Sequence, residues 1–361
     1  MKNADLKNFH QQLLNWFSQN QRKMPWRETG DPYYIWVSEV MLQQTQVKTV
    51  IPYYQNFIKQ YPTISHLAEA DQNDVLKVWE GLGYYSRARN LHKAAKQVIS
   101  EFNGQVPKDA ETFKKLPGVG DYIKAAVQSI AFGKPFAAVD GNVKRVLSRI
   151  FMIKSPVNRS SSHSEFSQKA DTLLERTHPG DYNQAMMELG ALICKPKNPL
   201  CETCPVNEFC SAFKKQKTTS YPVREKAKKV PEYQITVGIV KKGDMLLITK
   251  RKSDGLLGGL WEFPGGKIEN EETAEDACIR EIKEETNLIV KIADYLTTIK
   301  HAYTHFKIQM QVYLCSYQSG RVKLNGPVDH QWIPFSDISK FPFPKANLKF
   351  IPLLESKLDD F

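Results

Sequence analysis

The sequence predicts a multi-domain protein, in which an all-α domain is followed by a smaller α+β domain. The chain has 361 residues, whereas one hydrophobic core rarely serves more than about 250–300 residues. Apolar residues recur at helical spacing up to about residue 213, and from about residue 232 they alternate as they do in strands. Hydrophobic residues make up 41% of the chain, which is enough to give both domains a core.

The first domain is expected over residues 1–213, where the spacing of apolar residues predicts roughly ten helices. Leu6, Phe9, Leu13 and Phe17 lie three or four positions apart, which predicts a helix with one apolar face near the N-terminus. Short breaks that contain Pro or Gly separate the later helical segments.

The second domain is expected over residues 232–361. Runs rich in β-branched and aromatic residues predict its strands, and one acidic stretch predicts a helix. The predicted strands are 233–240, 245–250, 295–299 and 309–316, and the predicted helix is 272–285. Between the domains, residues 214–231 are polar and basic and include a proline, which predicts a linker.

The net charge of +11 is unevenly distributed along the chain. Residues 1–213 sum to +6, residues 214–229 to +6 and residues 230–361 to −1. Such an excess points to a polyanionic partner such as a nucleic acid or a membrane surface. No run approaches the ~18 apolar residues of a membrane helix, and the N-terminus lacks the apolar core of a secretory signal. We therefore expect a soluble, cytoplasmic protein with no membrane partner.

The turn Leu-Pro-Gly-Val-Gly joins two predicted helices. Gly118 and Gly120 flank Val119 and leave backbone N–H groups uncovered where the second helix begins. A phosphate suits such a helix N-terminus, and a helix–hairpin–helix uses it to grip a DNA backbone without reading sequence. An ordinary hairpin of two helices with a glycine turn is the alternative.

Two isolated carboxylates suggest acid catalysis. Glu39 lies in an uncharged run, where burial would raise its pKa, and Asp140 lies in Val-Asp-Gly-Asn-Val at 139–143. A protonated Glu and an ionised Asp in one pocket can cleave a glycosidic bond, and a base in duplex DNA must first be flipped out. The alternatives are a helix cap or an Asx turn at Asp140, and an exposed or capping glutamate at Glu39.

Other polar and aromatic residues could contact a distorted duplex. Gln43, Gln44 and Thr45 follow the candidate acid and could fill the space that a flipped base leaves. The run Gly-Leu-Gly-Tyr-Tyr-Ser-Arg-Ala-Arg at 81–89 offers stacking and phosphate contacts, although it could also simply open a surface helix.

Four cysteines within residues 194–210 predict a metal centre, namely Cys194, Cys201, Cys204 and Cys210. Zinc usually takes two short Cys pairs, but only the middle pair is short here. One contiguous loop of four cysteines suits an iron–sulfur cluster better. Cys278 and Cys315 stand alone and are expected to pack in a core.

In the second domain the segment 266–288 fits the Nudix box except at Asn287, where glycine is expected. Glu281, Glu284 and Glu285 share one helix face and could hold Mg2+ beside a diphosphate. A solvated acidic helix face is the alternative. Asn adopts the left-handed conformation more readily than most residues, so it can replace the glycine.

In this order the motifs resemble the A/G-specific adenine DNA glycosylases, the MutY family of the helix–hairpin–helix superfamily. The resemblance rests on 38–47, 79–90, the glycine turn, 139–143 and the four-cysteine loop. It implies a monomeric, monofunctional glycosylase that excises adenine opposite 8-oxoguanine or guanine in double-stranded DNA. It also implies a [4Fe–4S] cluster on the four cysteines and a Nudix-like domain that recognises the lesion.

The resemblance also assigns roles to individual residues. Glu39 corresponds to the acid that protonates adenine at N7, and Asp140, with Asn142 beside it, to the carboxylate that stabilises the sugar cation. Tyr122 stands where endonuclease III carries its Schiff-base lysine, and Lys124 lies about 200° further round the helix.

The remaining assignments concern the base pocket and the DNA contacts. The family's adenine pocket maps onto Arg22, Trp26, Arg27, Leu42, Val47 and Gln184, the last of which is Glu in some members. DNA binding and lesion recognition map onto Gln44, Thr45, Leu82, Tyr84, Gly118, Val119, Gly120, Tyr303, Thr304 and His305.

Two other functions compete with this one. The first is a bifunctional pyrimidine-lesion glycosylase that also cuts the strand, against which Tyr122 argues. The second is a Nudix nucleotide hydrolase whose helical domain only binds DNA.

Overall fold

The computed structural model describes residues 3–226 and 229–358. The chain forms two compact units. The first comprises Met1–Ala68 and Lys93–Ala227, and the second comprises Glu69–His92 and Lys228–Phe361. Within the described residues, no helix combines the length and the apolar character that crossing a membrane requires.

All regular secondary structure in residues 3–226 is helical, as the apolar spacing predicts. Twelve α-helices and four 3-10 helices occur in this stretch of the described chain, more α-helices than the predicted ten, because helices as short as four residues carry too few positions to show a period. Their bounds are α1 (Asn3–Asn20), η1 (Pro25–Arg27), α2 (Pro32–Leu42), α3 (Val47–Gln60), α4 (Ile64–Glu69), α5 (Gln72–Val78), α6 (Ser86–Phe102), α7 (Ala110–Lys114), α8 (Asp121–Phe132), α9 (Gly141–Phe151), η2 (Ser160–Ser162), α10 (His163–Leu173), α11 (Pro179–Leu192), η3 (Asn207–Phe209), α12 (Ser211–Lys214) and η4 (Thr218–Ser220).

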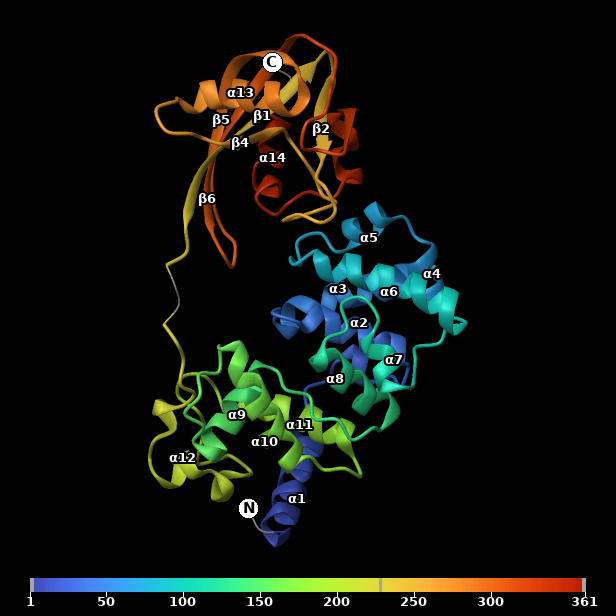
Figure 1. The fold of residues 1–361 in the computed structure, drawn as a ribbon, viewed down its shortest axis with the longest axis vertical. Helices are drawn as coiled ribbons and strands as arrows, with labels where there is room; N and C mark the ends of the chain where they lie inside the picture. The colour runs from blue at the N-terminus through green and yellow to red at the C-terminus, as the bar shows by residue number, and fades with distance from the viewer. Residues whose placement is uncertain (1–2, 227–228, 359–361) are drawn as a thin grey trace. The chain divides into compact units, whose positions relative to one another are not determined.

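One core of the first unit forms around the N-terminal helix. Phe9, Leu13 and Phe17 line one face of α1 and are at most 4% exposed. They pack against apolar residues of α9, α10 and α11, so that residues near both ends of the helical stretch share one core (Figure 1). This packing fixes α9 and α11 against each other, and these two helices carry much of the site described below.

The second unit contains a mixed sheet. Within the described residues it has seven strands, in the order β3-β2-β1-β6-β5, with β4 paired to β1 and β7 to β2. Only β1 and β6 are parallel, and Val237 pairs with Val312. The strands are β1 (Glu232–Lys242), β2 (Met245–Lys250), β3 (Trp261–Glu262), β4 (Gly265–Lys267), β5 (Ile289–Ala302), β6 (Lys307–Ser319) and β7 (Asp329–Pro334), and the helices are α13 (Ala274–Thr286), η5 (Phe335–Lys340), η6 (Asn347–Lys349) and α14 (Ile351–Leu354).

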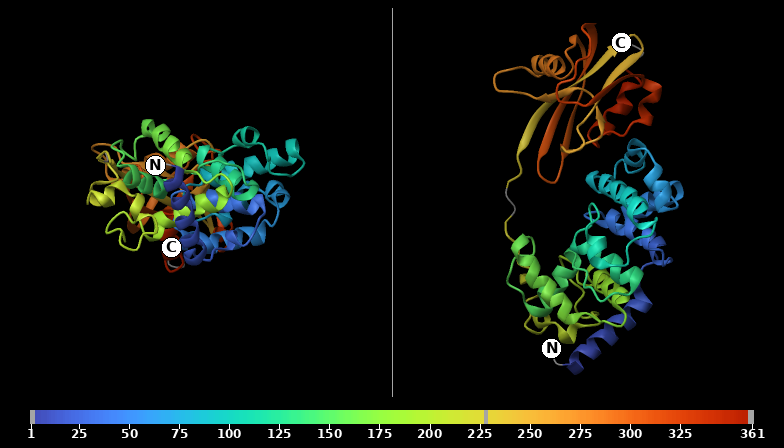
Figure 2. Two further views of the ribbon diagram at one scale, coloured as in Figure 1. Left: turned by 90° about the horizontal axis from the view of Figure 1, so that it is seen from below. Right: turned by 45° about the vertical axis from the view of Figure 1, so that its right-hand side comes forward.

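Both faces of this sheet are covered. Alternation sends Ile239 of β1 to one face and Val240 to the other, because successive side chains of a strand point in opposite directions. Ile239 packs with Phe343 and Phe350 of the C-terminal segment, while Val240 packs with apolar residues of α13. The sheet therefore lies between α13 and the C-terminal helical turns (Figure 2).

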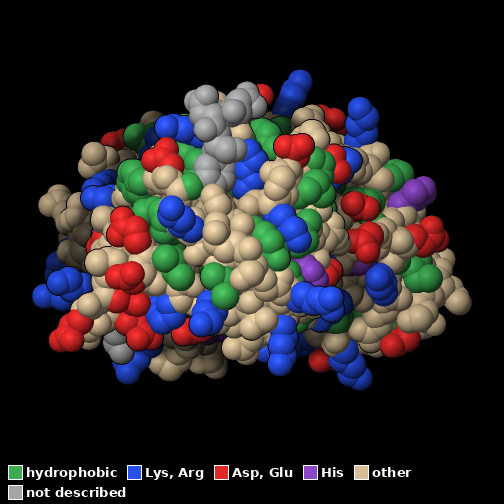
Figure 3. Space-filling view, turned by 90° about the horizontal axis from the view of Figure 1, so that it is seen from above, with side chains coloured by type: hydrophobic (Ala, Val, Ile, Leu, Met, Phe, Trp, Pro, Cys, Tyr) green, Lys and Arg blue, Asp and Glu red, His purple; other side chains and the backbone are tan. Residues whose placement is uncertain are grey.

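Charged side chains of both signs are mixed on the molecular face drawn in Figure 3. Lys and Arg side chains alternate there with Asp and Glu side chains, and no continuous patch of one sign covers this face.

The domain boundaries expected from the sequence, at residues 213 and 232, stay a prediction.

Candidate active site

The candidate acid Glu39 is buried in the first unit, on helix α2. It is 4% exposed, and the hydroxyl of Tyr122 donates a 2.6 Å hydrogen bond to its Oε2. Burial raises the pKa of Glu39 to about 7, although the Tyr122 hydrogen bond and the charge of Arg27 lower it and the charge of Asp140 raises it. Glu39 can therefore hold a proton near neutral pH.

Asp140 caps the N-terminus of α9. One carboxylate oxygen accepts the backbone N–H of Val143 at 2.7 Å, and the other accepts Nδ2 of Asn142 at 2.9 Å. Burial raises the pKa of Asp140 from its ordinary value, and these hydrogen bonds oppose the rise. The sequence predicts either a cap or a catalytic carboxylate at this position. In the structure the cap also lies close enough to Glu39 to influence its charge.

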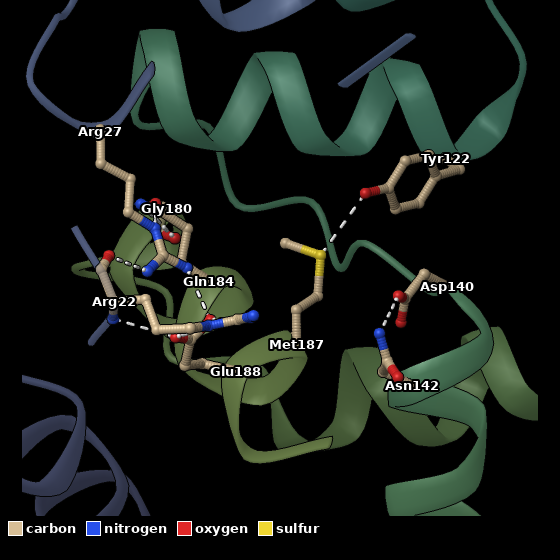
Figure 4. A network of polar contacts seen from close by, with 9 residues as sticks. All are labelled: Arg22, Arg27, Tyr122, Asp140, Asn142, Gly180, Gln184, Met187 and Glu188. Atoms are coloured by element: carbon tan, nitrogen blue, oxygen red, sulfur yellow. Dashed lines mark hydrogen bonds and ion pairs between the residues drawn. The ribbon is translucent and has the colours of Figure 1, made fainter. Parts of the chain in front are cut away.

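Arg22, Arg27 and Gln184 lie together with a buried carboxylate that the sequence did not single out (Figure 4). Glu188 of α11 is 1% exposed and accepts Nε of Arg22 at 2.7 Å and Nη2 of Arg27 at 3.1 Å. Nε of Arg27 also donates to Oε1 of Gln184 at 3.1 Å. Burial acts to raise the pKa of Glu188, but the Arg22 hydrogen bonds and the charge of Arg27 outweigh it and hold that pKa below its ordinary value.

The other predicted pocket residues lie on neighbouring elements. Trp26 is buried in η1 and its ring meets Tyr54 edge to face, with centroids 5.2 Å apart. Leu42 ends α2 and Val47 begins α3, and both are partly exposed. Met187 also belongs to this site, although the sequence did not single it out. Its Sδ lies 3.4 Å from the Tyr122 hydroxyl (Figure 4).

The residues predicted to contact DNA are divided between the two units, and five of them lie in the first. Gln44 and Thr45 form the turn between α2 and α3, where Gln44 has a left-handed φ of 56°. Gly118 has a φ of 79° in the turn before α8, where a residue with a Cβ would be strained, and Gly120 is the N-cap of that helix. Val119 between them is buried.

In the second unit, Leu82 and Tyr84 lie beside Gly81 and Gly83, which have φ values of 90° and 79°. Tyr303, Thr304 and His305 connect β5 to β6. Thr304 and His305 are exposed, and the Tyr303 ring stacks on Phe306 at 4.8 Å. The Tyr84 hydroxyl and the Thr304 hydroxyl share a hydrogen bond.

The four cysteines line one cavity of the first unit, together with Arg149, Leu200 and Phe213. Burial raises the pKa of Cys204 to about 12, so this thiol would ionise only against a positive centre such as iron. All four thiols come from one contiguous loop and line the same cavity, so the donor set fits an iron–sulfur cluster.

Arg149 of α9 is a third residue whose place in a site the sequence did not predict. It is 2% exposed, and its Nη1 donates to Sγ of Cys194 at 3.1 Å and to the carbonyl of Lys195 at 2.8 Å. Its Nε donates to the carbonyls of Thr218 and Tyr221, each at 3.1 Å. Arg149 therefore connects the cysteine loop to the start of the predicted linker.

On the Nudix-like helix α13, one arginine contacts two of the three box carboxylates. Arg280 forms ion pairs with Glu281 at 3.1 Å and Glu284 at 3.3 Å, and burial raises the pKa of Glu285 to about 8. Asn287 ends the helix with a left-handed φ of 62°, as the prediction for this position requires.

The buried thiols of Cys278 and Cys315 pack in the core, with their sulfurs 4.0 Å apart.

Comparison with known proteins assigns each part of the chain. Residues 37–174 match the model of the HhH-GPD superfamily of base excision DNA repair proteins, residues 194–210 match the iron–sulfur binding domain of endonuclease III, and residues 236–353 match the NUDIX domain. The adenine DNA glycosylase of Mus musculus is 33% identical over 98% of this chain and 79% of its own length. The adenine DNA glycosylase of Buchnera aphidicola subsp. Schizaphis graminum is 32% identical over 96% of this chain and 99% of its own length.

The chain belongs to the adenine DNA glycosylase family. It is a base-excision DNA repair glycosylase with an iron–sulfur cluster loop and a Nudix-like domain, which confirms the predicted family, fold class and cofactor.

Solved structures agree with this fold. A thermostable thymine-DNA glycosylase is 33% identical and covers 59% of this chain and 98% of its own, with a TM-score of 0.54. A non-covalent endonuclease III–DNA complex is 24% identical over 60% of this chain and 98% of its own, with a TM-score of 0.51, and shows the fold alone. The roles of individual residues in this adenine DNA glycosylase family member stay predictions.

Proposed function

We propose that this chain excises adenine from duplex DNA where adenine is paired with 8-oxoguanine or guanine, and that it acts as a monomer. One observation carries the proposal, namely the buried Glu39 with a pKa of about 7, hydrogen-bonded by a tyrosine and close to Asp140. A general acid works best when its pKa lies near the working pH.

The geometry supports a hydrolysis in which this chain's own side chains move the proton. Glu39 donates its proton to N7 of the flipped adenine, and the bond between the base and C1′ then breaks as the base leaves neutral. The carboxylate of Asp140, held in place by Asn142, stabilises the positive sugar. Water adds to C1′ and returns a proton to Glu39, which leaves free adenine and an abasic site.

The proposal includes an intact strand after base release. Cutting the strand through a Schiff base needs an amine at the reacting carbon, and Tyr122 offers a hydroxyl there. The nearby Lys124 is engaged elsewhere, since its Nζ pairs with Glu111 at 3.3 Å and lies over the ring of Phe136.

The turn Tyr303–His305 is proposed to read the base opposite the adenine. The exposed hydroxyl of Thr304 and the imidazole of His305 supply polar contacts, and the stacking of Tyr303 on Phe306 fixes the base of the turn.

A base-release assay on the purified holoprotein tests the proposal. Duplexes that contain A:8-oxoguanine, A:G, A:T and T:G are compared, and adenine should leave only the first two. Strands should stay whole until alkali is added, and borohydride should trap no adduct. A Glu39→Gln variant should be inactive. Release of thymine from T:G, or strand cutting before alkali, contradicts the proposal.

The role of the turn needs its own variants. Thr304→Ala and His305→Ala should reduce the preference for 8-oxoguanine over guanine and leave activity on A:G in place. Gln318→Ala, at an exposed position on β6, serves as the matched control. An unchanged preference in both turn variants contradicts the reading role.

A further inference from the structure

Helix α11 touches the active site at several positions of one face. Gln184 contacts Arg27, Met187 contacts Tyr122, and Glu188 contacts both arginines (Figure 4). Positions three and four apart share one side of a helix, so these contacts arise from a single stripe. Among them Glu188 is the charged one.

Glu188 has its hydrogen-bonding capacity fully used by the arginines. It accepts the backbone N–H of Arg22 at 3.0 Å, Nε of Arg22 at 2.7 Å and Nη2 of Arg22 at 2.9 Å, in addition to Nη2 of Arg27. Such a bidentate pair fixes the plane of the Arg22 guanidinium. A buried carboxylate with two arginines leaves one net positive charge for the three groups.

Arg22 and Arg27 differ in how far their guanidinium groups remain accessible for a further contact. Arg27 is 12% exposed in its side chain, and its three guanidinium nitrogens donate to Gln184, Glu188 and the carbonyl of Arg22. The Arg22 side chain is 37% exposed, and its guanidinium reaches past Glu188 toward Met187 (Figure 4). Arg22 thus retains an accessible, oriented cation.

We propose that Glu188 is a positioning residue of this active site, which fixes both guanidinium groups at one wall of the pocket and cancels one of their two charges. This inference rests on the proposed function. The role differs from plain structural support, because the charge of Arg27 acts on the acid Glu39. Glu188 therefore limits how strongly the arginines favour the ionised form of that acid.

Several charged or titratable groups act on the carboxyls of Glu39 and Glu188. Tyr122 from α8, Asp140 from the N-cap of α9 and Arg27 from η1 act on Glu39. Arg22 and Arg27 act on Glu188. Arginine stays charged across the usable pH range. Replacing the Glu188 carboxylate is therefore enough to change the net charge that it shares with Arg22 and Arg27.

The test compares Glu188→Gln with the wild-type holoprotein in single-turnover adenine release across pH. Loss of the negative charge leaves Arg27 uncompensated, so the alkaline limb of the rate profile should move to lower pH by about half to one unit. Glu188→Asp retains the charge and should keep the limb in place even if its rate falls. Asp181→Asn, at an exposed carboxylate of the same helix, should leave the whole profile unchanged.

A double variant covers the case in which Glu188→Gln fails to fold. Arg27→Gln combined with Glu188→Gln removes one charge of each sign, so its alkaline limb should lie at or above the wild-type pH. A limb that stays in place in the single variant, or that falls equally in the double variant, overturns the inference.

A substrate-free measurement separates this inference from the proposed function. The infrared band of the protonated Glu39 carboxyl, identified as the band that Glu39→Gln removes, should titrate at lower pH in Glu188→Gln than in the wild type. If the wild type releases no adenine, the proposed function fails, and the infrared titration still decides the positioning role. An unshifted titration overturns it.

Discussion

Tyr122 donates a 2.6 Å hydrogen bond to the buried carboxyl of Glu39, across 83 positions of sequence. Glu39 is buried and Tyr122 is half-buried, and burial raises the pKa of Tyr122 well above its ordinary value, so this hydroxyl remains neutral. The same bond lowers the pKa of Glu39 against the larger effect of burial. In the proposed function, Tyr122 therefore tunes the pKa of the acid Glu39 and offers no amine that could form a Schiff base.

Tyr122→Phe should raise the pKa of Glu39, because the hydrogen bond it removes favours the ionised carboxylate. The alkaline limb of the excision profile should therefore move up by about half to one pH unit. Single-turnover rates measured from pH 5 to pH 10 check this, with Tyr295→Phe at an exposed position as the control. A move of the limb to lower pH would show that another group sets it.

Glu39→Gln should abolish excision and yet stabilise the folded protein at alkaline pH. The folded pKa of Glu39 is about 7 against an ordinary 4.5, so the stability that its neutral form provides is present below pH 4.5 and lost as pH rises through 7. This rise in the pKa corresponds to about 3 kcal/mol of folding free energy. Urea denaturation should show the variant more stable than wild type at pH 8 and equal to it near pH 4.5. Equal stability at both pH values contradicts the raised pKa.

Asp140→Asn should separate chemistry from helix capping. Asn caps helices about as well as Asp, so the melting temperature should stay near that of the wild type. Excision should nevertheless fall by about two orders of magnitude or more, because the amide carries no charge to stabilise the sugar cation. Asp140→Ala should lose the cap as well, at about 1 kcal/mol. Retained activity in Asp140→Asn argues against an electrostatic role.

Gly190→Ala should damage the active site through crowding. An added Cβ would lie 2.6 Å from Cβ of Asn142 and 3.1 Å from its backbone oxygen, so α9 would have to move. We expect a loss of about 1–3 kcal/mol in unfolding free energy together with slower excision. Gly30→Ala is the control, since nothing lies within 4 Å of its added Cβ. A Gly190→Ala protein with wild-type stability and rate contradicts this packing.

Arg149→Met should weaken retention of the iron–sulfur cluster. The variant loses the hydrogen bond to Cys194 Sγ and four hydrogen bonds to carbonyls of the cysteine loop and of residues 218–221. Visible absorbance of the cluster should decay several-fold faster under a chelator than in the wild type. Arg176→Met, at an exposed ion pair, should decay like the wild type. Equal decay rates in the two variants would assign Arg149 no part in holding the loop.

Local features of the site followed from the sequence. A buried Glu in an uncharged run, an Asp three residues before the N–H that it caps and an Asn able to end a helix at positive φ are all short-range properties. Strand prediction was less complete, because β3 has two residues and β4 has three, too few to show alternation. The predicted strand 295–299 is one part of β5, which runs from Ile289 to Ala302 with irregular register.

The role of Glu188 could not be predicted from the sequence. In sequence it is one more glutamate in a helix, and its partner Arg22 lies 166 positions away. Arg149 likewise follows the ordinary pattern of a basic residue near a helix C-terminus, but it is buried against Cys194. No local pattern distinguishes these two from solvent-exposed charges.

Residue type and spacing along the chain were enough to predict the order of the two folds, the family, the cysteine loop and the two carboxylates proposed to carry the chemistry. The raised pKa of Glu39, the pairing of Glu188 with Arg22 and Arg27, and the contact of Arg149 with the cysteine loop emerge only from the folded chain. Charge states and buried partners depend on desolvation and on distances across the fold, and neither is encoded in neighbouring positions of the chain.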